Sequence, residues 1–508
     1  MTSPGPSRAL PHRALVIGYG LSGRAAADWL AGGGCEVVVL EDDLVAGRAA
    51  QTAAEVAGLT VEVAPGPALS AELAQRVDLV VPSPGVRAGH PAIAGAVAAG
   101  VPVLSELELA WRVLDEAHER PGGGRPKLVA ITGTNGKTTV TQLVTAMLAC
   151  SGQAAVASGN VGYPLLEAVR HLNPGSGSVL VAEVSSFQLE YTDEFRPDVS
   201  CWLNFAPDHL DWHPTLEHYW RAKAKIWSRQ GPGCTAVINA DDPVVQQAAE
   251  SVPVGVDVVT FGFSRLLGAV SPSLAAGDDA GPDWAGSDWA GPKGDEPAWV
   301  IRHEGIKGPR GFFLASEDLP RALPHDLANT AAALAISLAS GASEDGCLEA
   351  ARKTVAPPHR VQLVAEKGGI AWYDDSKATT PAAVLAGVRG FSSVVPIAGG
   401  RNKGLDLSEL ASTVPPVRAV VAVGESAPDV ARAFAGRAPV RRAASMGEAV
   451  DAAAGLAVPG DVVVLSPGCA SFDWYSSYVE RGEDFSALVK GKLRSEPDGA
   501  SHREAGIP

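Results

Sequence analysis

Residues 128–150 constrain the fold most, because an apolar strand, a glycine-rich loop and a helix follow directly on one another there. Leu128 to Ile131 is typical of a buried strand, and Gly-Thr-Asn-Gly-Lys-Thr-Thr occupies positions 133–139. Apolar residues then recur at helical spacing at Val140, Leu143, Val144, Met147 and Leu148. The loop therefore precedes a helix N-terminus, where free N–H groups and the helix dipole favour phosphate.

This loop is shorter than the general phosphate-binding pattern, which has four residues between its first glycine and the Gly-Lys pair. Only Thr134 and Asn135 separate Gly133 from Gly136. Lys137 is expected to contact phosphate oxygens, while Thr138 or Thr139 offers a hydroxyl to Mg²⁺. A purely structural glycine turn is the alternative, and the flanking strand and helix argue against it.

A second glycine loop, Gly-Tyr-Gly-Leu-Ser-Gly at residues 18–23, follows the apolar run Ala14 to Ile17. A helix-like stretch and the strand-like run Glu36 to Leu40 come next, and Glu41 follows where an acidic residue would meet a ribose or a base. Glycines at this spacing let the backbone approach a diphosphate. NAD, a uridine nucleotide and a structural turn all remain open.

Length and composition predict a globular protein of about three α/β domains. The chain has 508 residues, 46% of them hydrophobic, and a formal net charge of −16 that argues against nucleic acid or an anionic membrane as partner. No secretory signal pattern and no apolar run of membrane-spanning length are present, so we expect a soluble cytoplasmic protein. The six cysteines lack zinc-ligand spacing and are expected to be buried, reduced thiols.

Breaker residues divide the chain into the predicted domains 1–120, 121–357 and 358–508, with boundaries at Pro121-Gly-Gly-Gly124 and Pro357-Pro358. Residues 264–298 are rich in Gly, Asp, Pro and Ala and contain a near-tandem repeat, which predicts a flexible insertion. Strands predicted near 370–373, 394–398, 419–423 and 462–465 alternate with helices. A Rossmann-like sheet is expected there.

Chemistry-bearing residues follow predicted strands in the middle block. Glu183 ends the strand Ser178 to Ala182, and Asp-His-Leu-Asp occupies 208–211. Carboxylates at strand ends border the crevice of a parallel sheet. Taken alone, His209 would more often be a surface hydrogen-bond partner, and residues 219–226 an amphipathic helix with solvated lysines.

Taken together, the motifs resemble the Mur ligase family of peptidoglycan precursor synthesis. They are the loop at 133–139, Glu-Val-Ser-Ser-Phe-Gln-Leu-Glu at 183–190, Asp-His-Leu-Asp, and Ala-Lys-Ala-Lys-Ile at 222–226. Asp-Asp-Ser-Lys-Ala-Thr at 374–379 and Leu-Ser-Pro-Gly-Cys-Ala-Ser at 465–471 are similar to the members that add D-glutamate to UDP-N-acetylmuramoyl-L-alanine. The chain departs from the family in the 264–298 insertion and at Asp326, where asparagine is frequent.

The resemblance implies an ATP-dependent acid–amino-acid ligase of three α/β domains: a Rossmann-like UDP-binding domain, a central P-loop ATPase domain with a mostly parallel sheet, and a Rossmann-like C-terminal domain. The substrate carboxylate would become an acyl phosphate before the amine of D-glutamate attacks it. The resemblance also implies two Mg²⁺ ions and domain closure around the site. We expect a monomer.

The resemblance assigns roles to residues of this chain. The catalytic set is Lys137, Glu183, His209 and Lys223, and the Mg²⁺ set is Thr138, Glu183, His209 and a carbamylated Lys223. The ATP set is Gly133, Thr134, Asn135, Gly136, Lys137, Thr138, Thr139, Asn329, Arg360 and Asp375. The UDP-substrate set is Gly20, Leu21, Ser22, Glu41, Ser83 and Asn160. D-Glutamate has two carboxylates, which need separate cationic or hydrogen-bonding groups, and the third block offers Lys377, Thr379, Lys403, Ser471 and Tyr478.

Three other interpretations compete with this one. An NAD-dependent dehydrogenase would use the first glycine loop and leave the second unexplained. A folylpolyglutamate synthetase shares the shortened phosphate loop but does not match the third-block motifs. A nucleotide-gated scaffold with a decayed ligase site is disfavoured by the intact Lys137, Glu183, His209 and Lys223.

Overall fold

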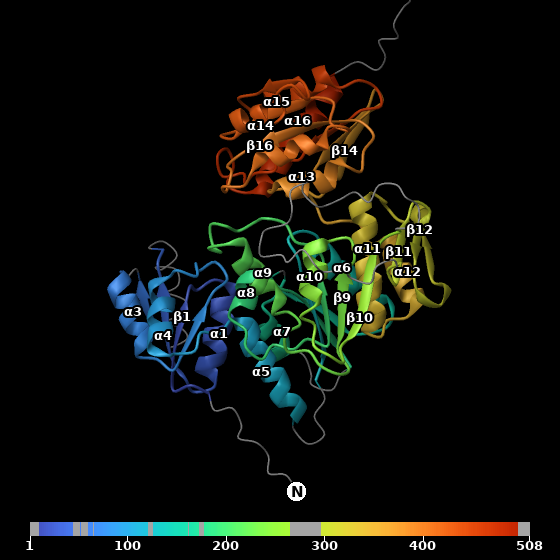
Figure 1. The fold of residues 1–508 in the computed structure, drawn as a ribbon. Coiled ribbons are helices and arrows are strands. Elements are labelled where there is room, and N and C mark those ends of the chain that lie inside the picture. The colour runs from blue at the N-terminus through green and yellow to red at the C-terminus, as the bar shows by residue number, and fades with distance from the viewer. Residues whose placement is uncertain are drawn as a thin grey trace, which may run out of the picture.

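The computed structural model of the chain describes residues 10–43, 51, 59–63, 66–119, 125–160, 162–171, 177–264 and 296–495. Three β-sheets follow one another along the chain, each flanked by helices (Figure 1). The breaker residues 121–124 lie outside the described residues, and so does the predicted insertion apart from its two ends.

The first sheet has four parallel strands in the order β3-β2-β1-β4. Its strands are β1 (Arg13–Ile17), β2 (Glu36–Glu41), β3 (Thr60–Val63) and β4 (Leu79–Pro82). Its helices are α1 (Leu21–Gly32), α3 (Pro67–Gln75) and α4 (Pro91–Ala99). α5 (Glu106–Glu119) then packs on α1 and on helices of the second sheet, so the apolar core continues from one sheet to the next.

The second sheet has nine strands in the order β13-β12-β11-β10-β9-β8-β5-β7-β6. They are β5 (Lys127–Thr132), β6 (Ala155–Gly159), β7 (Val179–Glu183), β8 (Val199–Trp202), β9 (Thr235–Asn239), β10 (Asp257–Phe263), β11 (Trp299–Arg302), β12 (Gly305–Lys307) and β13 (Phe313–Ala315). All pairings are parallel except those of β12 with β11 and β13. The expected mostly parallel sheet is confirmed.

The helices of the second sheet are α6 (Lys137–Cys150), α7 (Leu165–His171), α8 (Ser186–Glu190), α9 (Leu216–Ala224), α10 (Pro243–Ala249), α11 (Pro324–Ala339) and α12 (Glu344–Lys353). The apolar positions predicted for α6 are buried in one core cluster with β5 and α11. Each fully buried Val, Leu or Met contributes about 1.5–3 kcal/mol. α6 therefore fixes the phosphate loop at its N-terminus to the sheet.

The third sheet has six strands in the order β14-β15-β19-β16-β17-β18, and only β14 is antiparallel to its neighbour. They are β14 (Gln362–Lys367), β15 (Ile370–Asp374), β16 (Val394–Gly399), β17 (Val420–Val423), β18 (Val440–Arg442) and β19 (Val462–Leu465). The helices α13 (Pro381–Val388), α14 (Ala427–Ala433), α15 (Met446–Leu456) and α16 (Tyr478–Ser495) cover it. The alternation of strands and helices agrees with the expectation for this block.

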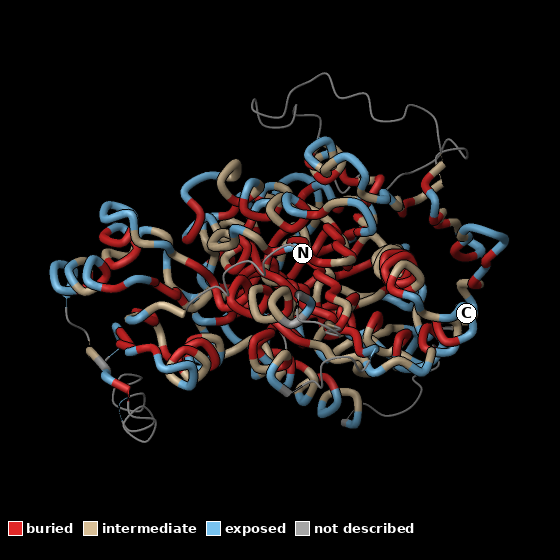
Figure 2. The backbone as a smooth tube through the Cα atoms, turned by 90° about the horizontal axis from the view of Figure 1, so that it is seen from below, coloured by how far each residue is buried: buried red, intermediate tan, exposed pale blue. Residues whose placement is uncertain are grey.

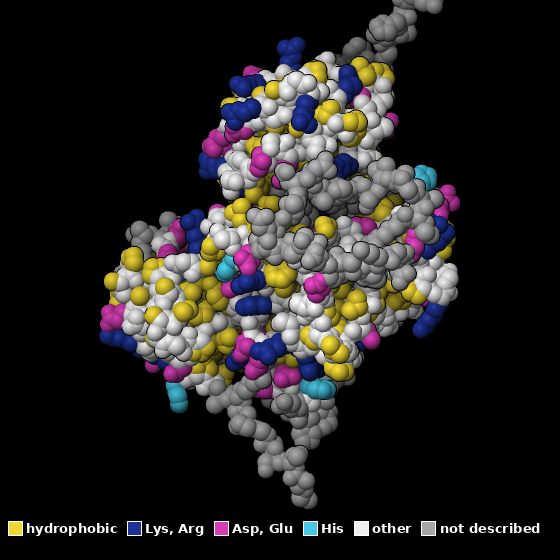
Figure 3. Space-filling view, in the orientation of Figure 1, with side chains coloured by type: hydrophobic (Ala, Val, Ile, Leu, Met, Phe, Trp, Pro, Cys, Tyr) yellow, Lys and Arg dark blue, Asp and Glu magenta, His cyan; other side chains and the backbone are white. Residues whose placement is uncertain are grey.

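Buried residues, drawn in red, gather in the interior of the molecule (Figure 2). On the face drawn in Figure 3, basic and acidic side chains are interspersed, without a continuous basic band among the described residues. All six cysteines are unpaired. Five are buried as expected, but the expectation is wrong for Cys150, which is exposed at the end of α6.

Candidate active site

The phosphate loop joins β5 to α6 and needs both of its glycines. Gly133 and Gly136 have φ angles of 153° and 84°, which side chains rarely adopt. A Cβ atom on Gly136 would lie 2.6 Å from Asn329 Oδ1, and one on Gly133 would lie 3.0 Å from Leu203 Cβ. The predicted ATP residue Asn329 is thus packed against the loop.

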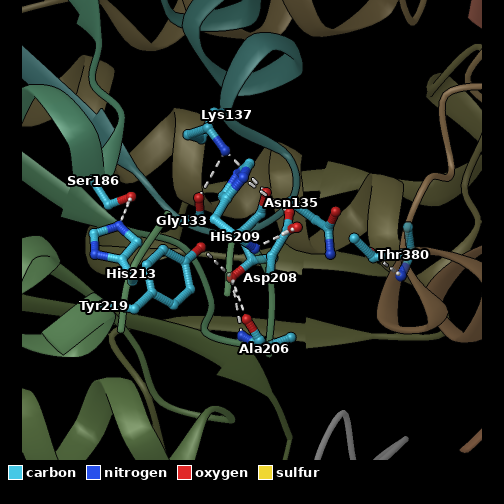
Figure 4. Close-up of polar contacts among 12 residues, drawn as sticks. Gly133, Asn135, Lys137, Ser186, Ala206, Asp208, His209, His213, Tyr219 and Thr380 are labelled. Carbon is cyan, nitrogen blue, oxygen red and sulfur yellow. Dashed lines mark hydrogen bonds and ion pairs between the residues drawn. The ribbon is translucent and has the colours of Figure 1, made fainter. Parts of the chain in front are cut away.

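Asn204 holds the loop from the neighbouring strand-end segment. Its side chain accepts from Asn135 N at 2.8 Å and donates to Asn135 O at 3.1 Å. Thr134 Oγ1 lies 3.1 Å from Ala206 O and 3.2 Å from the Tyr219 hydroxyl (Figure 4). These bonds fix the loop before any ligand arrives. Our sequence reasoning missed Asn204, although it lies two residues beyond β8, which neighbours β5.

Lys137 lies folded over its own loop. Its Nζ donates to Gly133 O at 2.8 Å and to Thr134 O at 2.9 Å. Burial lowers the pKa of Lys137, while the charges of Glu183 and Asp208 act in the opposite direction. Thr138, at the start of α6, is buried beside it.

Lys223 is 1% exposed, so the interpretation of residues 219–226 as a helix with solvated lysines is wrong for it. Its Nζ donates to Gly133 O at 2.9 Å and lies 3.3 Å from Thr132 Oγ1, and its ammonium lies 4.8 Å from the centre of the Tyr219 ring. Burial lowers its pKa well below the ordinary value, and the charge of Lys137 lowers it further. This environment favours a neutral amine.

Glu183 ends β7 and is 2% exposed. Its Oε1 accepts from Asn160 Nδ2 at 3.0 Å, which brings a predicted substrate residue beside a predicted metal residue. Its Oε2 is buried and has no hydrogen-bond partner among the described residues. A buried carboxylate oxygen without a partner is costly, and a cation would satisfy it.

His209 has a left-handed backbone conformation, with φ of 56°, and lies beside Asp208 (Figure 4). Its Nε2 lies 3.3 Å from Asp208 Oδ2. Burial lowers its pKa, Asp208 acts in the opposite direction, and the positive charges of Lys403 and Lys137 lower it further. The neutral imidazole is therefore favoured.

Two predicted ATP residues of the third block extend this site. Burial raises the pKa of Asp375 to about 7. A hydrogen bond from Ser466 at 2.8 Å and the charge of Arg360 act in the opposite direction and lower it. Burial lowers the pKa of Arg360, and the charges of Asp375 and Glu183 oppose it. Arg360 and Lys377 both lower the pKa of Lys137. Cations of the third block thus act on the phosphate loop.

The predicted glutamate residues follow the carboxyl ends of three neighbouring strands of the third sheet. Lys377 and Thr379 follow β15, Lys403 follows β16, and Ser471 with Tyr478 follows β19, with β15 and β16 flanking β19. The Lys377 ammonium lies 4.9 Å from the centre of the Tyr478 ring. Ser471 is buried, and Thr379 is partly buried.

Arg481 joins two of these loops and was not found from the sequence. It is 3% exposed, and its guanidinium donates to Ser376 Oγ at 3.0 Å and to Cys469 O at 3.2 Å. Arg481 lies in the first turn of α16, and nothing in the neighbouring sequence indicates that this arginine is buried.

The first glycine loop is held by two predicted substrate residues. Glu41 Oε2 accepts from Tyr19 N at 3.0 Å, and Ser83 Oγ donates to Gly18 O at 2.9 Å. Gly20 precedes α1 as its N-cap, and the Leu21 side chain is 73% exposed beside the partly buried Ser22. A hydrogen bond of 2.7 Å from Trp212 Nε1 to Val86 O links this region to the segment that follows His209.

The described residues show neither a metal-binding cluster of acidic, histidine and cysteine side chains nor a membrane-spanning helix. No group of three or more His, Cys, Asp and Glu side chains is placed to hold a metal ion. The predicted Mg²⁺ set contains only two residues of these types, and Mg²⁺ usually keeps several waters with one or two carboxylates. No described helix combines the length and apolarity needed to cross a membrane.

Comparison with known proteins gives consistent matches along the chain. Three family descriptions match: the Mur ligase MurD-like N-terminal domain at residues 12–105, the Mur ligase middle domain at 131–271, and the Mur ligase glutamate ligase domain at 359–469. A UDP-N-acetylmuramoylalanine--D-glutamate ligase of Frankia casuarinae is 39% identical over 94% of both chains. One of Thermobifida fusca is 36% identical over 94% of this chain and 98% of its own.

Solved structures support the same fold. The UDP-N-acetylmuramate-alanine ligase MurC of Thermotoga maritima has a TM-score of 0.52 at 17% identity, covering 96% of this chain and 100% of its own. MurF of Acinetobacter baumannii has a TM-score of 0.54 at 16% identity, covering 83% and 92%. At these identities the likeness concerns the fold alone.

Proposed function

The chain belongs to the Mur ligase family, and from this premise we propose that it joins D-glutamate to UDP-N-acetylmuramoyl-L-alanine while ATP is converted to ADP and phosphate. The relatives that share 35–39% of its residues carry the name of that ligase. The observation that carries the proposal is the meeting of two predicted catalytic lysines at the phosphate loop, where Lys137 Nζ and Lys223 Nζ donate to the carbonyl oxygen of Gly133 at 2.8 Å and 2.9 Å.

The proposed reaction needs an activated carboxylate, because a free carboxylate is a poor electrophile. An oxygen of the alanine carboxylate attacks the γ-phosphorus, the bond to the bridging oxygen breaks, and ADP leaves. Lys137, released from the Gly133 and Thr134 carbonyls, would bind the transferring phosphoryl oxygens. Arg360 would add a second positive charge from the third block.

The second step forms the amide. The amine of D-glutamate attacks the acyl phosphate, the carbon–oxygen bond to phosphate breaks, and the amine gives its proton to solvent. Both reactants are anions, so Lys137 and Arg360 must offset their repulsion. Burial lowers the pKa of His209, which favours a neutral imidazole that adds no positive charge.

Magnesium fits the residues present. The partnerless Glu183 Oε2 and the hydroxyl of Thr138 are hard oxygen donors, and we assign them to one ion. We assign His209 and Lys223 to a second ion, with Lys223 as a carbamate, since burial lowers the pKa of its amine and so favours the neutral form that reacts with CO₂. When bound, Mg²⁺ would neutralise phosphate charge and hold the phosphoryl group in line.

We assign the substrates to the three predicted domains. The UDP moiety would bind residues 1–120 at Gly20, Leu21, Ser22, Glu41 and Ser83, with Asn160 reaching the same substrate from the second block. ATP would bind within 121–357, with Arg360 and Asp375 contributed by 358–508. D-Glutamate would bind Lys377, Thr379, Lys403, Ser471 and Tyr478. We propose that the reaction takes place in the cytoplasm on a single chain.

Phosphate release from ATP tests this function. We expect release to depend on both UDP-N-acetylmuramoyl-L-alanine and D-glutamate, and to stay at background when either is omitted. Dihydrofolate with L-glutamate serves as the control for folylpolyglutamate synthesis. Phosphate release that is the same with and without D-glutamate would contradict the proposal.

A further inference from the structure

Arg321 is the centre of a network where α11 meets the third block. Its guanidinium binds both carboxylate oxygens of Asp326, through Nε to Oδ2 and Nη2 to Oδ1, each at 2.6 Å. Its third nitrogen, Nη1, donates to the carbonyl of Arg360 at 3.0 Å and also to the carbonyl of Val361. One arginine thus ties the first turn of α11 to the segment that carries Arg360.

The backbone around Arg360 needs this support. His359 and Val361 have φ angles of 62° and 46°, and the left-handed region is unfavourable for a β-branched side chain such as valine. The N–H of Val361 donates to Asp375 Oδ1 at 3.2 Å, while its carbonyl accepts from Arg321. Side chains from two directions therefore hold the strained residue, and Arg360 lies directly before it.

His325 gives the network a second link to the third block. Its Nδ1 lies 3.2 Å from the carbonyl oxygen of Ala386 on α13, and its Nε2 lies 3.4 Å from Arg321 Nη2. A carbonyl oxygen only accepts, so Nδ1 carries the proton and Nε2 accepts from Arg321. Burial lowers the pKa of His325, which is consistent with this neutral tautomer. The surroundings are tight, since a Cβ on Gly390 would lie 2.9 Å from Leu323 Cδ2.

We propose that Arg321 and Asp326 are positioning residues that fix the backbone of Arg360 and thereby aim its guanidinium at the phosphate loop. The inference rests on the proposed function, which makes Arg360 an ATP contact. Both oxygens of Asp326 are engaged, and Oδ2 also accepts from Leu323 N at 3.2 Å. An asparagine offers a single, uncharged oxygen and could not accept the two guanidinium bonds on separate oxygens. Asp326 therefore acts on Arg321.

A double-mutant cycle tests this role through the steady-state kinetics of ATP. We expect Arg321→Gln and Arg360→Ala each to lower kcat/KM for ATP about tenfold or more, because each disturbs a charged hydrogen-bond network. The double variant should be no slower than Arg360→Ala alone, since both changes remove one interaction. Arg321→Lys should recover part of the loss, and Asp326→Asn should be intermediate.

Arg352→Gln is the matched control, because Arg352 of α12 forms an exposed ion pair with Asp318 at 2.8 Å. Its kinetics should equal those of the parent enzyme. Losses that multiply in the double variant would overturn the inference, as would a folded Arg321→Gln enzyme with parental kcat/KM. If Arg321→Gln does not fold, the cycle is measured with Asp326→Asn and Arg360→Ala, and the same two outcomes apply. A parent enzyme without glutamate-dependent turnover would instead contradict the proposed function.

Discussion

Lys223 Nζ lies 2.9 Å from the carbonyl oxygen of Gly133, although 90 residues separate the two in the chain. The contact joins the last turn of α9 to the first glycine of the phosphate loop. It places a fully buried amine among Thr132, Lys137 and Tyr219, where an ammonium is poorly accommodated.

Lys223→Ala should therefore abolish most of the activity, because the proposed carbamate oxygens near Mg²⁺ would be lost. Acetate should restore part of it by placing a carboxylate in the vacated volume. Arg221→Ala, at a 70% exposed position on the same helix, is the control and should keep parental turnover. Full activity of a folded Lys223→Ala enzyme in CO₂-depleted buffer would show that no carbamate is needed.

Glu106 provides a stability prediction away from the site. Its Oε1 accepts from Leu166 N at 2.5 Å, its Oε2 is buried without a partner among the described residues, and burial raises its pKa from 4.5 to about 7. The folded state therefore holds a proton that the unfolded state releases between these values. Stability contributed by this group is fully present below pH 4.5 and is lost as the pH rises to about 7.

Glu106→Gln should remove this loss, which amounts to about 3 kcal/mol at most. Thermal unfolding followed from pH 5 to pH 8 should show a smaller decline in the variant than in the parent. Glu116→Gln, on the same helix, should leave the parental decline unchanged. An identical pH dependence in Glu106→Gln and the parent would mean that Glu106 is not protonated in the fold.

The glutamate pocket can be separated from the nucleotide site by mutation. Lys377→Ala and Ser471→Ala should raise KM for D-glutamate, with a loss in kcat/KM worth about 1–3 kcal/mol, because a substrate carboxylate loses its partner. KM for ATP should change little in Ser471→Ala. Arg441→Ala on the exposed strand β18 is the control. Unchanged glutamate kinetics in both variants would remove these residues from the pocket.

The predicted insertion can be shortened but not removed. β10 and β11 pair in parallel, so a crossover connection between them is required. Its ends are close, since Ser264 Oγ donates to Glu296 Oε1 at 2.7 Å. Replacing residues 268–292 with a glycine-serine linker of about twelve residues should keep turnover within about twofold. Loss of turnover with unchanged circular dichroism would reveal a functional role for the insertion.

The sequence predicted those parts of the site that depend on local periodicity and on strand ends. β5, the loop to Lys137 and α6 could be placed because each has its own pattern within a few residues, and Glu183 because it ends an apolar run. The burial of Lys223 could not be predicted from the local pattern of its helix, because its hydrogen-bond partner, the carbonyl oxygen of Gly133, lies 90 residues away in the chain. Asn204, Arg321 and Arg481 were missed for the same reason: each acts on a backbone segment that only the fold brings near.

The most direct test of the central claim is the incorporation of radiolabelled amino acids into UDP-N-acetylmuramoyl-L-alanine with ATP and Mg²⁺. D-Glutamate should be incorporated, whereas L-glutamate, L-alanine and diaminopimelate should stay near background. With both carboxylates of glutamate held, inversion at Cα would turn the amine away from the acyl phosphate. Incorporation of L-glutamate, L-alanine or diaminopimelate at the rate of D-glutamate would contradict the account.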